Sequence, residues 1–96
     1  MLDEFVVNLK SEGSIKHYLK VKIALMYTEE KQGILIESSV NKIRDVIISN
    51  LREKSYKEML EAENFLTLKK EVIDNLNLAI NEDIIKDIYI TDIIIQ

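Results

Sequence analysis

The chain contains no cysteine, no proline and no tryptophan. Without cysteine, disulfides, thiolate nucleophiles and cysteine-based zinc sites are all excluded. The compartment stays open, because proteins outside the cytoplasm can also lack cysteine. No apolar run approaches the roughly 20 residues that a membrane-spanning helix needs, and no signal peptide is visible.

Residues that carry common catalytic chemistry are equally scarce. His17 is the only histidine, and a lone histidine cannot build a usual zinc site, so we expect it to have a structural or surface role. With only Gly13 and Gly33, no glycine-rich phosphate loop and no nucleophile elbow can form. The residues alone therefore carry no catalytic signature and no cofactor-binding motif. A small hydrolase or ligand-binding domain would need a deep polar pocket with perturbed titrating groups.

Three acidic pairs are candidates for a catalytic carboxylate dyad. Each lies at an expected helix end or on a polar face, where carboxylates are solvated or complement the helix dipole. The pairs are Glu29–Glu30, Glu61/Glu63 and Glu82–Asp83. Their positions favour this structural interpretation over a dyad.

The composition is that of an ordinary globular domain. The 96 residues are 47% hydrophobic and 31% charged, and this length predicts one domain over residues 1–96. A domain of this size buries roughly 60–70% of its unfolded surface, enough for one core. The net charge of −4 argues against nucleic acid as a partner.

The most β-prone stretch is the last one, residues 83–96, which is dominated by isoleucine, tyrosine and threonine. From Ile88 onward apolar side chains fall on both faces. This pattern predicts a strand that is covered on both sides rather than an edge strand with one wet face.

Two further strands are predicted near the N-terminus. The first covers residues 5–10, with Phe5, Val7 and Leu9 on one face, and the second covers about 15–27. The second strand alternates, and we place one of its two sets of side chains in the core. The core set is Leu19, Val21, Ile23, Leu25 and Tyr27, and the opposite set is Tyr18, Lys20, Lys22, Ala24 and Met26. The short connection predicts an antiparallel hairpin.

Helical periodicity begins after Thr28, a plausible N-cap. One helix is predicted to run to about residues 50–55, since its apolar positions recur at three and four. These positions are Ile36, Val40, Ile43, Ile47 and Leu51. Ser55 and Glu58 then have the spacing of a capping box and predict a short helical turn.

A third helix is predicted over residues 62–81. Its stripe is Phe65, Leu68, Val72, Leu76 and Ala79, widened by Leu66, Ile73 and Ile80. The predicted order is therefore β-β-α-α-α-β, an α+β fold. The final strand should pair antiparallel with the second, and two long helices should cover one face of the small sheet.

Two groups of residues are candidates for function. Tyr18, Lys20, Lys22 and Met26 form a mixed basic and apolar strand face. It is either solvated, covered by a helix, or a contact surface for another subunit or partner. Arg44–Asp45 flanks the stripe of the first helix, where an ion pair could orient that helix.

Four stretches together resemble the extracytoplasmic domain of the flagellar basal body-associated FliL family. The stretches are Phe5-Val6-Val7-Asn8-Leu9, Gly13-Ser14-Ile15-Lys16-His17-Tyr18-Leu19-Lys20-Val21, Ile43-Arg44-Asp45-Val46-Ile47-Ile48-Ser49-Asn50-Leu51 and Ile88-Tyr89-Ile90-Thr91-Asp92-Ile93-Ile94-Ile95-Gln96. They occur in the family's order and cover nearly all of the chain.

The resemblance implies a fold similar to the stomatin/SPFH-type domain. It implies a location on the outer face of the cytoplasmic membrane at the flagellar basal body, held by a single N-terminal membrane helix outside this sequence. Proteins of this family are thought to form ring-shaped homo-oligomers around the stator proteins MotA and MotB. They support stator assembly or activation, swimming and swarming, with no catalysis and no small-molecule substrate. An SPFH-like membrane scaffold unconnected to flagella is the alternative.

Overall fold

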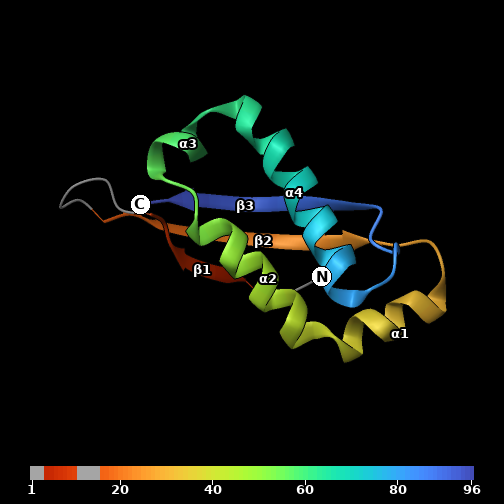
Figure 1. The fold of residues 1–96 in the computed structure, drawn as a ribbon. Coiled ribbons are helices and arrows are strands. Elements are labelled where there is room, and N and C mark those ends of the chain that lie inside the picture. Colours follow the sequence, from red (N-terminus) through yellow and green to blue (C-terminus); the bar gives the residue numbers. More distant parts are fainter. Residues whose placement is uncertain (1–3, 11–15) are drawn as a thin grey trace.

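The computed structural model describes residues 4–10 and 16–96, apart from the side chains of residues 62–65 (Figure 1). The elements are β1 (Phe5–Asn8), β2 (Tyr18–Met26), α1 (Glu30–Ser38), α2 (Val40–Arg52), α3 (Tyr56–Leu60), α4 (Ala62–Ile80) and β3 (Asp87–Ile95). The α+β class is confirmed. The described residues form four helices, one more than the predicted order contained.

The three strands form an antiparallel sheet with the order β1-β2-β3, so β2 lies in the centre. Val7 pairs with Leu19, and Ile23 pairs with Ile90. The predicted hairpin and the predicted pairing of the final strand with the second are both confirmed.

The core lies between the sheet and the two long helices, α2 and α4, which cross one face of it (Figure 1). Alternation along the strands sends every second side chain into this layer. Its buried members include Phe5, Val7, Leu9, Leu19, Val21, Ile23 and Ile88 from the sheet side, Ile43, Ile47 and Leu51 from α2, and Leu68, Val72 and Leu76 from α4. The two-helix cover is confirmed.

Tyr27 is an exception to the predicted core, because its side chain is 42% exposed. It lies one residue beyond the end of β2 and packs against α1. A Cβ added at Gly33 would meet the Tyr27 Oη at 2.5 Å. Because Gly33 has no side chain, the Tyr27 ring can occupy the space beside it. The ring therefore lies against α1 and outside the core.

The single helix predicted after Thr28 is two helices. α1 ends at Ser38 and α2 begins at Val40, and between them Ser39 leaves helical geometry with φ −109° and ψ 14°. The N-cap is Glu29 rather than Thr28. The reason is the Gln32 side chain, whose Oε1 accepts the backbone N–H groups of both Thr28 and Glu29 at 3.0 Å. The Thr28 backbone therefore donates a hydrogen bond to the Gln32 side chain, and Thr28 does not act as the N-cap.

The predicted capping box is confirmed at the start of α3. Glu58 N–H donates to Ser55 Oγ at 3.2 Å, and Ser55 N–H donates to Glu58 Oε1 at 3.3 Å. The bond from the Ser55 backbone stabilises the ionised carboxylate and lowers the pKa of Glu58, with a smaller contribution from the Ser55 hydroxyl. The short helix is thus fixed by its own first turn.

The third predicted helix corresponds to α4, which ends at Ile80 with Asn81 in a left-handed cap at φ 64°. Leu68, Val72 and Leu76 are buried as predicted, but Leu66 is 75% exposed and does not widen the stripe. Phe65, placed in the stripe by the sequence, lies outside the described side chains.

The prediction that the final strand is covered on both sides is wrong. β3 is an edge strand, flanked only by β2 among the described residues. Ile88 is fully buried, but Tyr89, Ile93 and Ile94 are 47%, 40% and 48% exposed. The helices cover one face of a three-stranded sheet, so alternate apolar residues of β3 stay in solvent.

Candidate interaction surface

The four predicted strand-face residues lie together on the side of the sheet opposite the helices. Tyr18 and Lys20 are exposed, Met26 is 38% exposed and Lys22 is half-buried. Cross-strand pairing adds neighbours to them: Lys20 sits between Val6 and Ile94, and Ala24 pairs with Tyr89. We call this set the open face; it comprises Val6, Tyr18, Lys20, Lys22, Met26, Tyr89 and Ile94. No described helix covers it.

The open face mixes exposed apolar groups with two cations. Lys22 Nζ lies 3.7 Å from Asp92 Oδ2, whereas Lys20 forms no ion pair within the described residues. Tyr89 Oη donates to Met26 Sδ at 3.9 Å, which joins β3 and β2 on this side. A grouped set of exposed apolar side chains is typical of a protein-protein contact, and Lys20 adds a site for an acidic group.

Arg44 and Asp45 have different surroundings in the structure. The Arg44 guanidinium lies 4.1 Å from the centroid of the Phe5 ring, and Nη2 donates to the Glu4 carbonyl at 3.3 Å. Asp45 is exposed and makes no ion pair with Arg44. Arg44 therefore connects α2 to β1. A joint role of the two residues in orienting the helix stays a prediction.

Asn77 is a structural residue that the sequence reading missed. Its side-chain Oδ1 accepts the N–H groups of Ile84 and Ile85 at 3.1 and 2.9 Å, and its Nδ2 donates to the Ile85 carbonyl at 3.0 Å. These bonds fold the segment before β3 back against α4. The available signal was an amide directly after the buried Leu76 in an otherwise apolar stripe.

His17 holds two distant segments together. Its ring stacks on Tyr56 with centroids 3.8 Å apart, and its Nδ1 lies 3.1 Å from the Gln96 carbonyl. The contact links the start of β2, the α3 helix and the end of β3. This placement is a structural role of the kind expected for a lone histidine.

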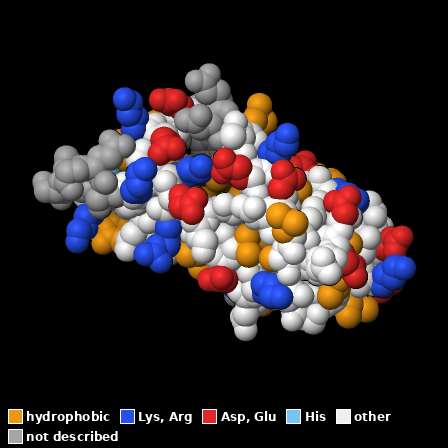
Figure 2. All heavy atoms as spheres, in the orientation of Figure 1, with side chains coloured by type: hydrophobic (Ala, Val, Ile, Leu, Met, Phe, Trp, Pro, Cys, Tyr) orange, Lys and Arg blue, Asp and Glu red, His pale blue; other side chains and the backbone are white. Residues whose placement is uncertain are grey.

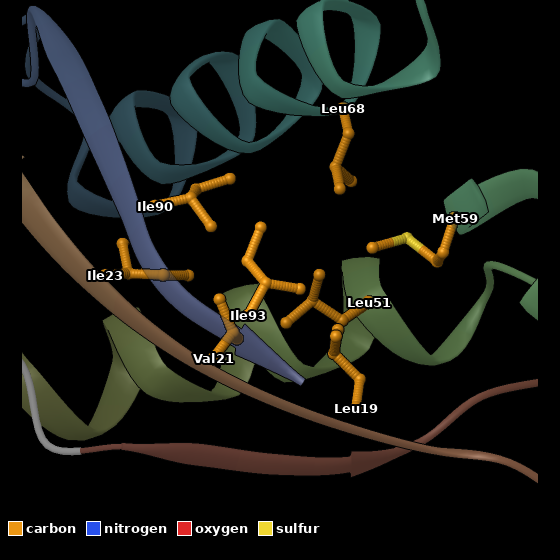
Figure 3. Close-up of a pocket in the computed structure, with 8 residues that line it drawn as sticks. All are labelled: Leu19, Val21, Ile23, Leu51, Met59, Leu68, Ile90 and Ile93. Carbon is orange, nitrogen blue, oxygen red and sulfur yellow. The ribbon is translucent and has the colours of Figure 1, made fainter. Parts of the chain in front are cut away.

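Two hollows bear on the hypothesis of a hydrolase or ligand-binding domain. One is wholly apolar and lies between the sheet and the helices, lined by Leu19, Val21, Ile23, Leu51, Met59, Leu68, Ile90 and Ile93 (Figure 3). The other is an open depression between α2 and α4, lined mainly by polar side chains such as Asp45, Asn50 and Asn75. Among the described side chains, which exclude those of residues 62–65, no three histidine or acidic groups converge to hold a metal.

On the face seen in Figure 2, the described side chains form no concentrated patch of one charge. On the side with the helices, acidic and basic side chains are interspersed with apolar ones (Figure 2). Across the part of the chain that the structure describes, none of the helices is both long and apolar enough to span a bilayer.

Comparison with known proteins agrees with the resemblance seen in the sequence. Residues 1–96 match the family described as "Flagellar basal body-associated protein FliL". A curated relative, "Flagellar protein FliL" of Aquifex aeolicus (strain VF5), is 27% identical over 92 residues. That alignment covers 96% of this chain but only 56% of the relative, so the chain spans about half of the relative's length. Since the family match extends over the whole sequence, the chain belongs to the FliL family of flagellar basal body-associated proteins.

Proposed function

We propose that this chain is a non-enzymatic scaffold domain that associates with the MotA/MotB stator and supports stator assembly or activation, swimming and swarming. The observation that carries the proposal is the match to the FliL family over residues 1–96. The open face supports it, because a scaffold needs exposed surface suited to protein contacts. The proposal places the domain on the extracytoplasmic side of the cytoplasmic membrane, with a fold similar to the SPFH-type domain.

The second part of the proposal is a ring-shaped homo-oligomer. A closed ring requires a heterologous interface, in which two different patches meet. The open face supplies one patch with an unpaired Lys20 within the described residues. α1 supplies a matching one, since Ile34 is 66% exposed and Glu30 and Glu37 are exposed on the same short helix. Apolar contact with opposite charges at its margin is the complementarity such an interface needs.

The stator association is tested with the full-length, membrane-anchored protein. Mild cross-linking in motile cells, followed by affinity purification and mass spectrometry, should recover MotA or MotB together with self-cross-links. Self-cross-links without stator subunits would favour a membrane scaffold that acts elsewhere in the basal body. Absence of both would overturn the proposal.

The ring interface is tested by disulfide trapping, for which the absence of cysteine is an advantage. The double variant Lys20→Cys with Glu37→Cys should form a ladder of disulfide-linked oligomers on mild oxidation in cells. Each single variant should give no ladder. As a matched control, Lys20→Cys combined with Glu82→Cys, on the turn after α4, should also give none. Ladders from the control pair alone would place the interface elsewhere.

A further inference from the structure

The polar depression between α2 and α4 contains a buried side chain whose hydrogen bonds are incomplete. Asn50 is only 8% exposed. Its Oδ1 accepts Asn75 Nδ2 at 3.3 Å, but its own Nδ2 donates to no atom of the described residues. Among these residues, no fully enclosed side-chain nitrogen or oxygen lacks a partner. Asn50 Nδ2 therefore reaches the surface, at the depression that Asn50 lines.

The bond between the two asparagines leaves one donor and one acceptor available to a ligand. Asn50 Nδ2 is the donor, and Asn75 Oδ1 is the acceptor, since it accepts no hydrogen bond from the described residues. A residue in an extended chain presents its own N–H and C=O on the same side. The amide pair is therefore complementary to the backbone of one extended residue, and the depression, of about 300 Å³, has room for it.

Two carboxylates, those of Asp45 and Glu53, line the same depression, and no lysine or arginine lines it. Neither carboxylate forms an ion pair within the described residues. Positions 45, 49 and 53 recur at four residues and share one face of α2, because Glu53 keeps helical geometry at φ −77° and ψ −14°. At the helical rise of about 1.5 Å per residue, the two carboxylate positions lie about 12 Å apart along the axis.

Three basic side chains around α2 are bound away from the depression. Lys42 Nζ donates to the Ala79 carbonyl at 3.4 Å, and Lys54 Nζ lies 3.1 Å from Glu71 Oε2. The Arg44 guanidinium lies over the Phe5 ring. These cations therefore do not balance the two carboxylates of the depression, and the side chains that complement those carboxylates are basic ones from a partner.

We propose that the depression between α2 and α4 is a docking site for an extended basic segment of another protein. The backbone of one residue of the segment bonds to Asn50 and Asn75. Lysine or arginine side chains two residues before and two residues after it reach Asp45 and Glu53. Four residues of extended chain span about 13 Å, which matches the separation of about 12 Å between the carboxylate positions. The site is separate from the open face, so the proposal does not depend on the ring or on stator association.

The strands of this chain do not supply such a segment. Among the described strands only β2 carries basic residues, Lys20 and Lys22. Its backbone is bonded to β1 on one side and to β3 on the other, so it has no free N–H and C=O to offer to the amide pair. Its two lysines are also two residues apart instead of four. The occupant is therefore a segment of another protein rather than a second copy of this chain.

The test is a titration of the intact, isotope-labelled chain with a capped peptide of about nine glycine and threonine residues that carries two lysines about four positions apart. At low ionic strength the side-chain amide signals of Asn50 and Asn75 should shift in the NMR spectrum, and the shifts give the Kd. Asp45→Asn and Glu53→Gln should each weaken binding about threefold. The matched control Glu82→Gln, which also removes one carboxylate, should weaken it less than about 1.5-fold.

Backbone recognition is tested separately from charge. Asn50→Leu, which keeps the side-chain size but removes Nδ2, should weaken binding at least about fivefold. Methylation of the peptide nitrogen midway between the lysines removes the donor to Asn75 Oδ1 and should weaken binding to the parent chain by a similar factor, whatever the fold of Asn50→Leu. No shift at either asparagine, equal affinity for the methylated peptide, or equal effects of Glu82→Gln and Asp45→Asn would overturn the proposal. So would self-association of the peptide-free chain through these two asparagines.

Discussion

The two outer edges of the sheet, at β1 and at β3, differ in the contacts that they make with the rest of the chain. At the β1 edge, Arg44 lies on Phe5 and the Glu4 carbonyl, and the segment before α3 bridges to Lys10. At the β3 edge, Asn77 fastens the chain just before the strand, but the strand itself exposes apolar side chains and outward backbone groups. Soluble proteins commonly cover, charge or bulge such edges to prevent unwanted pairing. β1 is bonded at both of its ends, by Arg44 and by the Lys54 carbonyl, while β3 carries a bulge.

The β1 edge therefore has a structural role, whereas the β3 edge is available for association. The contacts at β1 use residues from α2 and the α3 cap, so disturbing them should change the stability of the fold. The outer side of β3 contributes no such contacts, so changes there should alter association more than stability.

The largest effect is expected from Phe5→Ala. Phe5 is fully buried and carries the contact with Arg44, so its truncation should lower the free energy of unfolding by about 3–5 kcal/mol. Urea unfolding monitored by circular dichroism measures this. Val6→Ala, on the exposed side of the same strand, is the control and should stay within about 0.5 kcal/mol. A loss below about 1 kcal/mol for Phe5→Ala would show that β1 is not fixed through this ring.

The next largest effect is expected from Asn77→Ala. It should lower the free energy of unfolding by about 2 kcal/mol, because it leaves the amides of Ile84 and Ile85 without their acceptor. Amide exchange at these two residues should accelerate more than exchange in β1. The control is Asn75→Ala on the same helix, which removes a single part-buried bond to Asn50 and should cost less than half as much. Equal effects of the two variants would contradict the role given to Asn77.

Arg44→Met should lower the free energy of unfolding by about 1 kcal/mol, since the methionine keeps an apolar stem over Phe5 but loses the cation and the hydrogen bond to the Glu4 carbonyl. Exchange of the β1 amides should accelerate, while that of the β3 amides should not. Asp45→Ala is the control and should change stability by less than about 0.5 kcal/mol. A larger effect of Asp45→Ala than of Arg44→Met would place the helix-orienting contact on Asp45.

The smallest effect is a pH dependence at the α3 cap, which adjoins the covered β1 edge. The pKa of Glu58 is lowered from its ordinary value of 4.5 in the folded chain. The unfolded chain therefore takes up the proton first as pH falls, and the cap's stabilisation is complete above about pH 4.5 and is lost as pH falls through the lower folded pKa.

The measurement is the difference in urea midpoint between the parent and Glu58→Gln from pH 7 to pH 3. The difference should shrink below pH 4.5. It should be smaller at every pH in a Ser55→Ala background, where the hydroxyl partner is missing. A difference that stays constant across the range would contradict the assignment.

Local patterns in the sequence predicted the elements that depend on their own neighbours. Alternation in the second strand gave Leu19, Val21 and Ile23 as core and Tyr18 and Lys20 as exposed. The spacing of Ser55 and Glu58 predicted the α3 cap. Each of these depends on residues within one turn or one strand, where spacing carries the physical constraint.

The errors arose where a distant partner decides the outcome. Apolar residues on both faces of β3 suggested cover on both sides, but cover depends on how many strands and helices surround it. The contacts of Arg44 with the Phe5 ring and the Glu4 carbonyl join distant parts of the chain, so spacing within the helix could not predict them. The helix break at Ser39 has no neighbouring proline or glycine from which it could have been predicted.

The central position of β2 has a consequence for biosynthesis. Its two partners, β1 and β3, lie on either side of all four helices in the described sequence, so the helices are synthesised before this sheet is complete. Until residues 87–95 emerge, the apolar sides of α2 and α4 have only a two-stranded hairpin to cover. Such a hairpin is marginally stable alone, and pairing over this sequence separation is slow. The nascent chain therefore has a late folding step, during which its exposed apolar surface is a natural substrate for chaperones.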